Sequence, residues 1–447
     1  LEALKPGNTV HTDAEIAQMR AEGGSAGAIA QDWLEMTDEE VWEIIPGPAI
    51  PRTCLMVLGS REPDGGVGKG CPVCGTDIYE GRSGFYPWIF DAEEHPWKVG
   101  CPSCGTWFPS NDWQDGDMHS GPFPDDGWGC EPVEPVAGKG GTPWRWPFIA
   151  YYHQWQAYME TLTPGIMQAA EAYVRTGDER YAHKCGVALA RFAQAHLDMS
   201  LNLNHRKRVN RDGVYQGPVG APIKSRFTNL GGSFSYIQPN WDTPRMENAM
   251  RAYDLVFGAI SDDEALAEFV REQYHPEIQS AEDLHRFLHA GIIRTCAQYG
   301  IDNAVSRNWP MQEQMVATMA LGLGTPQSMG LVDHLLNGWP GLRYALSNNY
   351  LKDGAGHETG GYNRIQVRFM AGLSDIFARI EELMPDLYRP PQFISLTGDP
   401  KFRQMFDFPL NASLIGRVTD ETGDAGHPST APAQPRHRAG RTRTPCG

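Results

Sequence analysis

Hydrophobic residues recur at helical spacing over most of the chain after residue 150. The spacing predicts helices over Tyr151–Arg175 and Glu179–Asp198, with a break at Gly177 and Asp178 between them. Further helices are predicted over residues 243–260, 263–299, 309–322, 327–337, 339–350 and 362–384. No alternating strand pattern separates these stretches, so we expect a mainly α fold in which helical hairpins pack side by side, as in a solenoid or toroid.

The two ends of the chain have a different character. Residues 1–140 are rich in Gly, Pro, Asp and Trp and predict loops, short helices and short strands, followed by a linker over Glu131–Pro143. Residues 416–447 hold almost no apolar side chains and predict a linker and a disordered or non-native tail. The expected domains are therefore an N-terminal region (1–140), a helical domain (141–415) and the tail (416–447).

Four of the nine cysteines form two C-P-x-C-G turns. Cys71 and Cys74 are separated from Cys101 and Cys104 by 26 residues, which include enough aromatic side chains for a short hairpin. Two such turns supply the four thiolates that Zn²⁺ prefers in a tetrahedral structural site. We therefore expect a zinc-ribbon-like insert at about residues 70–113, in which the metal stabilises the fold. Two disulfides and free thiols are the alternatives.

Composition and charge narrow the classes of partner. Hydrophobic residues make up 41% and charged residues 21%, as in an ordinary globular protein, and no apolar run is long enough to span a membrane. A net charge of -17 disfavours nucleic acid as a partner. The long segment 202–242 carries a basic cluster that begins at His205, which predicts either a functional loop for an anionic ligand or a solvated basic loop.

Three segments carry polar groups that a helical core does not need. Arg307, Asn308 and Gln312 lie at the start of a predicted helix, where Asn308 is either functional or an N-cap. A glycine-rich turn over 352–363 carries His357, Glu358 and Tyr362, and the alternative is a polar surface loop. The third segment, 144–155, mixes aromatic rings with hydrogen-bonding side chains, which is typical either of a core or of a sugar-binding cleft. Its candidate binding residues are Arg145, Trp146, Tyr152 and His153.

The order of several short segments resembles heparinase II/III-like polysaccharide lyases over residues 70–415. The segments are Trp97–Gly105, Phe108–Asp112, Ala252–Val256, Asn308-Trp309, the loop 353–362 and Leu396–Asp399. The resemblance implies an (α/α) toroid followed by an antiparallel β-sandwich. This sequence has no recognisable β-sandwich, so we expect an incomplete toroid, and Gly423–Gly426 resembles the linker that would lead into the missing domain.

The resemblance also implies a chemistry and its residues. Asn308 matches a toroid asparagine near the substrate carboxylate, and Tyr362, 54 residues later, matches a tyrosine near the glycosidic oxygen. A histidine completes the site in many members, and His357 is our candidate for that role, with Glu358 orienting the loop. The expected substrate is an anionic polysaccharide or oligosaccharide such as alginate, glucuronan, ulvan or a glycosaminoglycan. The family also suggests a secreted or periplasmic bacterial protein.

Elimination at a uronic acid needs three groups. Asn308, aided by Arg307 or Gln312, would neutralise the carboxylate so that the C5 proton becomes acidic. A base then removes that proton and an acid protonates the 4-linked oxygen, and Tyr362 is a candidate for one or both steps.

Two other functions are compatible with the sequence. A glycoside hydrolase would use a pair of carboxylates, for which Asp242, Glu247, Asp254 and Glu358 are available. A non-catalytic polysaccharide-binding protein would keep the aromatic cleft and lack turnover.

Overall fold

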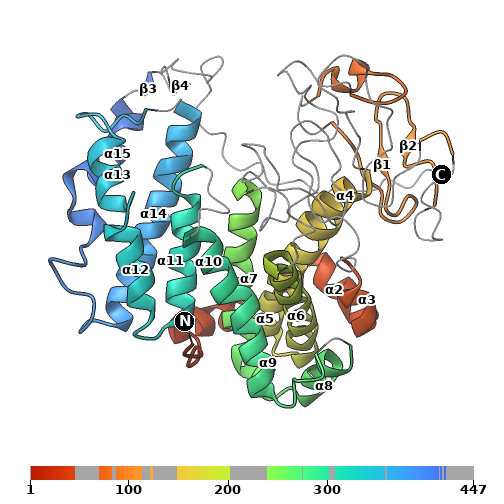
Figure 1. Ribbon diagram of the computed structural model, residues 1–447, viewed down its shortest axis with the longest axis horizontal. Helices are drawn as coiled ribbons and strands as arrows, with labels where there is room; N and C mark the ends of the chain where they lie inside the picture. The colour runs from red at the N-terminus through yellow and green to blue at the C-terminus, as the bar shows by residue number, and fades with distance from the viewer. Residues whose placement is uncertain are drawn as a thin grey trace. The chain divides into compact units, whose positions relative to one another are not determined.

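The computed structural model describes residues 2–45, 70–82, 87–112, 121–123, 148–201, 239–273, 275–301, 308–357, 360–411, 413–414 and 417–418. Helices dominate these residues, which confirms the predicted mainly α class (Figure 1). The chain divides into two compact units, Leu1–Leu331 and Val332–Gly447, and each is described by itself. None of the described helices is long and apolar enough to cross a membrane.

The first unit holds most of the helices. They are α1 (Asp13–Glu22), α2 (Ala28–Glu35), α3 (Asp38–Trp42), α4 (Phe148–Tyr152), α5 (Thr163–Thr176), α6 (Glu179–Leu201), α7 (Pro239–Ser261), α8 (Glu264–Gln273), α9 (Ala281–Leu288), α10 (Thr295–Ile301) and α11 (Met311–Leu323), and α12 (Ser328–Asn337) crosses the boundary. Two π-helical stretches, η3 (His153–Leu162) and η6 (His289–Arg294), continue α4 and α9.

Most predicted helices are confirmed, and the exceptions have local causes. Gly177 ends α5 in the left-handed conformation, φ 73°, as the predicted break requires. The prediction of one helix over 263–299 is wrong, because α8 ends at Gln273 and α9 begins only at Ala281, with Pro276 between them. In the N-terminal region, α1 and α3 each begin with a capping box, in which Thr12 and Thr37 pair with a glutamate three residues later.

Small residues allow the helices of the first unit to approach closely. Helix α5 packs on α6 and α7, and α11 packs on α7 and α10. A Cβ added at Gly291 of η6 would lie 2.5 Å from the Cα and the Cβ of Ala193 on α6, so only glycine fits there. The core of this unit is therefore built by interhelical contacts, with loops at the helix ends.

A small lobe, residues 70–82 and 87–112, contains the cysteine pairs, and we call it the metal lobe after the ion that the sequence predicts there. Its elements are the 3₁₀ turn η1 (Thr76–Tyr79) and the strands β1 (Val99–Gly100) and β2 (Trp107–Phe108). The strands pair antiparallel, with Val99 opposite Phe108. The hairpin thus encloses the second cysteine turn, whereas we predicted it between the two turns. The intervening segment contributes one antiparallel bridge, from Ile89 to Gly100.

The second unit is smaller and also mainly helical. It contains α13 (Leu342–Asn348), α14 (Gly360–Leu383), the 3₁₀ turn η7 (Leu396–Gly398), α15 (Pro400–Asn411) and the strands β3 (Ser413–Leu414) and β4 (Arg417–Val418). Helix α15, which the sequence pattern did not predict, packs on α14 and α13. The expected domain boundary at residue 140 and nearly all of the tail lie outside the described residues, so those predictions stay open.

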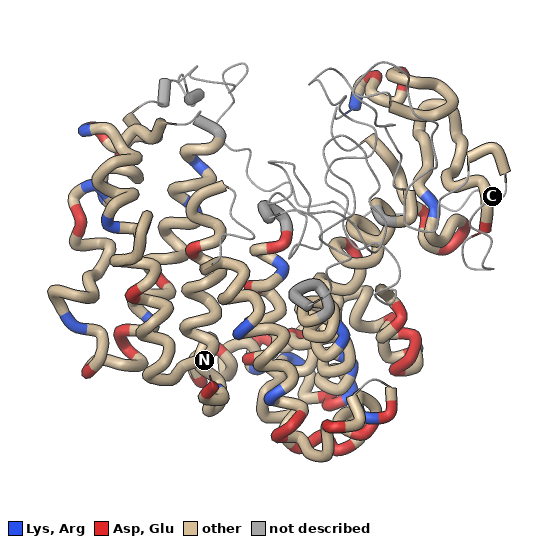
Figure 2. Tube along the Cα trace, in the orientation of Figure 1, with Lys and Arg blue, Asp and Glu red and all other residues tan. Residues whose placement is uncertain are grey.

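Charged residues are spread along the described helices, and acidic side chains are frequent on α3 and α8 (Figure 2). The basic cluster that begins at His205 lies outside the described residues.

One charged cluster joins α3, α6 and the start of α8. His183 of α6 lies between two carboxylates, with its Nδ1 atom 2.7 Å from Asp263 and its Nε2 atom 3.0 Å from Asp38. Lys184 also donates to Asp38, at 2.6 Å. Burial opposes the charge on His183, but the bonds to Asp263 and Asp38 outweigh it and raise the pKa of His183 to about 9. The hydrogen bond from His183 lowers the pKa of Asp38 to about 2.

This cluster predicts a pH dependence of stability. Because the folded pKa of His183 lies above its unfolded value of 6.5, its contribution is fully present below pH 6.5 and is lost as the pH rises through 9. The contribution of Asp38 is lost as the pH falls through about 2. We expect His183→Gln to lower the free energy of unfolding by at most about 3 kcal/mol below pH 6.5. It should also flatten the decrease in that free energy between pH 6.5 and 9. Urea unfolding at several pH values measures this. His275→Gln, which removes a pair with the exposed Glu277, is the control and should keep the decline; an unchanged decline in His183→Gln would contradict the prediction.

Candidate functional site

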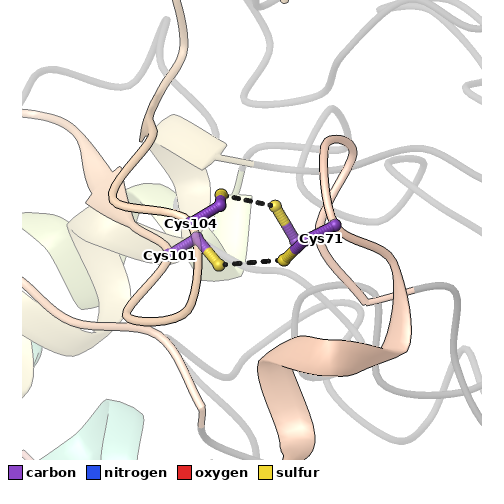
Figure 3. A group of neighbouring side chains, drawn as sticks. Cys71, Cys101 and Cys104 are labelled. Carbon is purple, nitrogen blue, oxygen red and sulfur yellow. Dashed lines mark hydrogen bonds between the residues drawn. The ribbon is translucent and has the colours of Figure 1, made fainter.

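Four cysteine side chains converge in the metal lobe, as predicted. The ligand atoms of Cys71, Cys74, Cys101 and Cys104 all lie within 4.8 Å of one another. The Sγ atoms of Cys71 and Cys104 are 3.7 Å apart and those of Cys74 and Cys101 are 3.5 Å apart (Figure 3). Tetrahedral coordination at about 2.3 Å places sulfurs about 3.8 Å apart, so the cluster fits one metal ion. These separations are too long for a disulfide bond, and the cysteines that the structure describes are free.

The turn sequence explains why the thiols converge. In each turn the glycine after the second cysteine has a positive φ, 61° at Gly75 and 74° at Gly105. Its N–H donates to the carbonyl of the first cysteine, at 2.8 Å in the first turn and 2.9 Å in the second. The N–H of Val73 also donates to the Cys71 sulfur at 3.3 Å, a contact that stabilises a thiolate. The four cysteines are thus arranged by backbone geometry that this sequence specifies.

The metal lobe shares a hydrophobic core with the start of the helical region. Buried Cys71, Trp88, Val99, Cys101 and Phe108 pack in one cluster with residues of α4, namely Phe148, Tyr151 and Tyr152. Phe108 stacks on Phe148 with ring centroids 5.0 Å apart. The predicted binding residues Tyr152 and His153 therefore lie where the metal lobe meets α4 and η3, both with buried side chains.

Asn308 and Gln312 lie at the start of α11, as predicted. The N–H of Met311 donates to the Asn308 carbonyl at 3.0 Å, and α11 has Pro310 at its N-cap position with no side-chain cap. Asn308 therefore does not occupy the N-cap position of this helix. Gln312 donates from its amide to the Gly300 carbonyl at 2.8 Å, which joins α11 to α10.

Hydrogen bonds within the glycine-rich loop of the second unit, and one to α14, fix the conformation of this loop. Tyr350 and Gly356 form an antiparallel bridge, and the Tyr350 hydroxyl donates to Gln366 of α14 at 2.8 Å. Gly354 has φ 89°, and a Cβ there would lie 2.1 Å from the Gln404 carbonyl oxygen, so this position requires glycine. His357 in this loop is exposed, and Tyr362 lies in the first turn of α14 with 39% of its surface exposed.

The predicted site residues are divided between the two units and the part of the chain that the structure does not describe. Asn308 belongs to the first unit, and His357 and Tyr362 belong to the second. The remaining predicted residues lie outside the described part of the chain, and they are Arg145, Trp146, His205, Arg307 and Glu358.

Sequence reasoning missed two residues near the predicted sites. Glu313 follows Gln312 in the first turn of α11, and its Oε2 atom is inaccessible and accepts no hydrogen bond. Burial raises the pKa of Glu313 to about 7, a value suited to proton transfer near neutral pH. Trp97, the residue at which the resemblance begins, contacts both Tyr152 and His153. A glutamate beside Asn308 was visible in the sequence, but its burial was not.

Two of the described carboxylates suggested for a hydrolase are engaged in structural contacts. Asp254 accepts from Lys5 at 2.6 Å and from the backbone N–H of Thr9 at 2.8 Å. Glu247 accepts from Gln314 at 2.7 Å, which joins α7 to α11. The nearby pocket between the N-terminal segment, α7 and α9 is lined by Tyr253, Ser261 and His285. Tyr253 and Ser261 each hydrogen-bond to the His285 ring, at 2.7 Å and 2.9 Å, so the polar groups of this pocket are engaged with one another through His285.

Comparison with known proteins identified no relative. The chain matches no model of a known protein family, and it matches no curated protein sequence.

Proposed function

We propose that this chain is a polysaccharide lyase of the heparinase II/III-like kind, which cleaves a uronate polymer by β-elimination. In this proposal residues 141–415 form an incomplete (α/α) toroid, and the four cysteines bind a structural Zn²⁺. The observation that carries it is the setting of Asn308 and Tyr362. Asn308 lies just before α11 without occupying its N-cap position, and Tyr362 lies in the first turn of α14 with an exposed side chain.

The described residues support the expected division of roles. The Asn308 amide would hydrogen-bond to the substrate carboxylate and so stabilise the negative charge that develops after removal of the C5 proton. Tyr362 would act as base, acid or both, because its side chain is exposed in the first turn of α14, next to the loop that carries His357. His357 remains the candidate partner in the same loop. Tyr152 and His153 have buried side chains, so they would support the sugar-binding surface from beneath and would not contact the sugar.

Elimination is favoured over hydrolysis because two of the carboxylates that a hydrolase could use make structural contacts instead. A hydrolase needs two carboxyl groups that face one glycosidic bond. Asp254 is fully buried in an ion pair with Lys5, and Glu247 is buried against α11, so both are engaged in structural contacts. Glu313 would be one suitable acid for a hydrolase, but we identify no second carboxylate that would act with it.

The proposal predicts an unsaturated product that absorbs in the ultraviolet. We expect the wild type to produce this absorbance with at least one of alginate, glucuronan, ulvan and the glycosaminoglycans. Tyr362→Phe should reduce the rate by about 10²–10⁴-fold, because it removes a proton-transfer group, and Asn308→Ala should have a similar effect.

Tyr344→Phe is the matched control, because Tyr344 is also 39% exposed and has no role in the proposed chemistry. New reducing ends without ultraviolet absorbance would show hydrolysis. Binding of oligouronates without any cleavage would support the non-catalytic alternative, and either result would overturn the proposed lyase.

A further inference from the structure

Trp97 has an unusual backbone conformation. Its φ of 59° lies in the left-handed region, and no other non-glycine residue in the described part of the chain has a positive φ. A bulky side chain is strained there, and such strain persists only when the surroundings fix the residue. The contacts on both sides of Trp97 show what fixes it.

On its C-terminal side, Trp97 is joined to the metal-binding hairpin. The next residue, Lys98, donates to the Pro109 carbonyl at 3.0 Å and also to the Asn111 carbonyl. Strand β1 follows directly and leads into Cys101. The backbone at Trp97 is therefore fixed by the hairpin whose turn supplies two of the four metal ligands.

On its other side, Trp97 contacts the start of the helical region. Its ring centroid lies 5.0 Å from that of Tyr152 and 6.1 Å from that of His153. Its backbone N–H donates to the Tyr152 hydroxyl, which partly offsets the rise that burial causes in the pKa of Tyr152. Tyr152 ends α4 and His153 begins the π-helix η3, a geometry that is rare and often occurs at functional sites.

We propose that Trp97 is a positioning residue through which the metal ion at the four cysteines fixes Tyr152 and His153. A lobe this small buries only a limited fraction of its surface on folding, so a bound metal would supply much of its order. Without metal the hairpin loosens, Trp97 returns to an unstrained conformation, and its indole no longer holds the two rings. Resting on the proposed function, the metal lobe is then one wall of the uronate-binding site.

The positioning role is tested without any activity measurement. Histidine side chains are labelled selectively with ¹³C in the full chain, and the signal of His153 is assigned with His153→Gln. We expect this signal to shift when the metal is removed by a chelator, and to shift similarly in metal-loaded Trp97→Ala. Far-UV circular dichroism should retain most of the helical signal in both samples. A His153 signal that stays unchanged after verified metal loss would overturn the proposal.

Three variants separate positioning from general damage to the lobe. Trp97→Phe retains a ring and should restore most of the native His153 signal. Trp107→Ala is the matched control, because Trp107 lies in the same lobe on β2 and stacks on His95 at 4.1 Å. If Trp107→Ala shifts the His153 signal as much as Trp97→Ala does, the effect belongs to the lobe as a whole and the specific role of Trp97 is refuted.

Enzyme kinetics test separately whether the metal lobe forms one wall of the uronate-binding site. For a polymer that the wild type cleaves, Trp97→Ala should raise KM roughly tenfold, or about 1.4 kcal/mol, and change kcat little. The reason is that displacing the Tyr152 and His153 rings would disturb the binding surface that they support. An unchanged KM would remove the metal lobe from the binding site. If the wild type cleaves and binds no polymer, the proposed function fails, and the His153 signal still decides the positioning role.

Discussion

Replacing Cys101 by serine is expected to abolish metal binding and to unfold the metal lobe while the helices of the first unit stay folded. Cys101 is fully buried, and its sulfur lies 3.5 Å from that of Cys74. A four-thiolate zinc site contributes on the order of 10–16 kcal/mol of apparent binding free energy, which in a small lobe is also folding free energy. No other change considered for this chain has so large an expected effect.

The reason for this dependence lies in the composition of the lobe core. Part of that core comes from α4, and two of its buried members are the ligands Cys71 and Cys101. Burial raises the pKa of the Cys71 thiol, and burial also raises that of Cys74 to about 11, so without metal both sulfurs would be protonated at neutral pH. Helices α5, α6, α7 and α11 pack on one another instead, and should persist.

Metal analysis measures the stoichiometry, which we expect to be one zinc per wild-type chain and none in Cys101→Ser. Limited proteolysis should then cut the variant within the metal lobe, with little loss of far-UV circular dichroism. Cys185→Ser is the matched control, because Cys185 is equally buried but lies on α6 outside the cluster. One tightly bound metal per Cys101→Ser chain would contradict the prediction, as would a wild type that binds no divalent metal.

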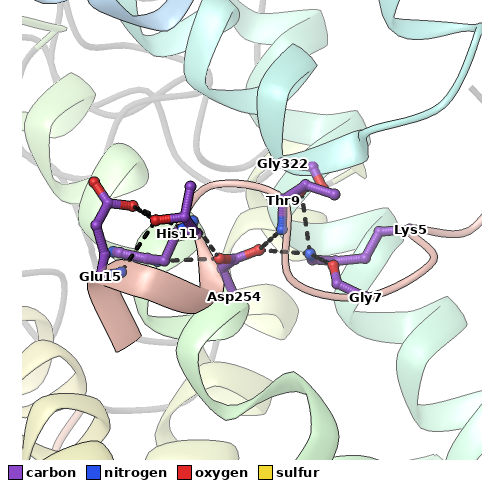
Figure 4. A network of polar contacts seen from close by, with 8 residues as sticks. Lys5, Gly7, Thr9, His11, Glu15, Asp254 and Gly322 are labelled. Atoms are coloured by element: carbon purple, nitrogen blue, oxygen red, sulfur yellow. Dashed lines mark hydrogen bonds and ion pairs between the residues drawn. The ribbon is translucent and has the colours of Figure 1, made fainter. Parts of the chain in front are cut away.

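Replacing Asp254 by alanine should lower the free energy of unfolding by about 3–5 kcal/mol, because it leaves a buried ammonium without its counter-ion. The side chains of Lys5 and Asp254 are 1% and 0% exposed and lie 2.6 Å apart. The same carboxylate accepts from the backbone N–H groups of Thr9 at 2.8 Å and His11 at 2.9 Å, and it contacts the His11 ring at 3.0 Å (Figure 4). Asp254 thus attaches the N-terminal segment to α7.

Urea unfolding gives the size of the effect, and proteolysis of the N-terminal segment gives its location. Asp178→Ala is the control, because its partner Arg180 is largely exposed and such surface pairs contribute only about 0–1 kcal/mol. Asp254→Asn should fall between the two, since an amide retains some of the hydrogen bonds but no charge. Equal unfolding free energies for Asp254→Ala and Asp178→Ala would show that the network does not stabilise the fold.

Local signals in the sequence were sufficient for the helices and the cysteine cluster. Helical spacing predicted the helices on both sides of Gly177, because apolar periodicity and a left-handed glycine act within one or two turns of chain. It failed over 263–299, where Pro276 interrupts an otherwise periodic stretch, and it missed α15.

The candidate site was predicted in part. The sequence placed Asn308 and Tyr362 on inter-helix loops; Asn308 lies just before α11, whereas Tyr362 lies within the first turn of α14. Their roles in a site stay predictions. It gave no sign that Glu313 would have a solvent-inaccessible carboxylate oxygen, because burial of one turn depends on helices that are distant in sequence.

By itself, the sequence determined a mainly α protein with four thiols arranged for one metal ion, since repeated spacing within short segments specifies both features. Only the tertiary structure decided that Asp254 pairs with Lys5, 249 residues away, and that Trp97 of the metal lobe lies against Tyr152 and His153. Such contacts join segments whose local sequence patterns are independent of each other. Which segments pack together therefore depends on the folding of the whole chain.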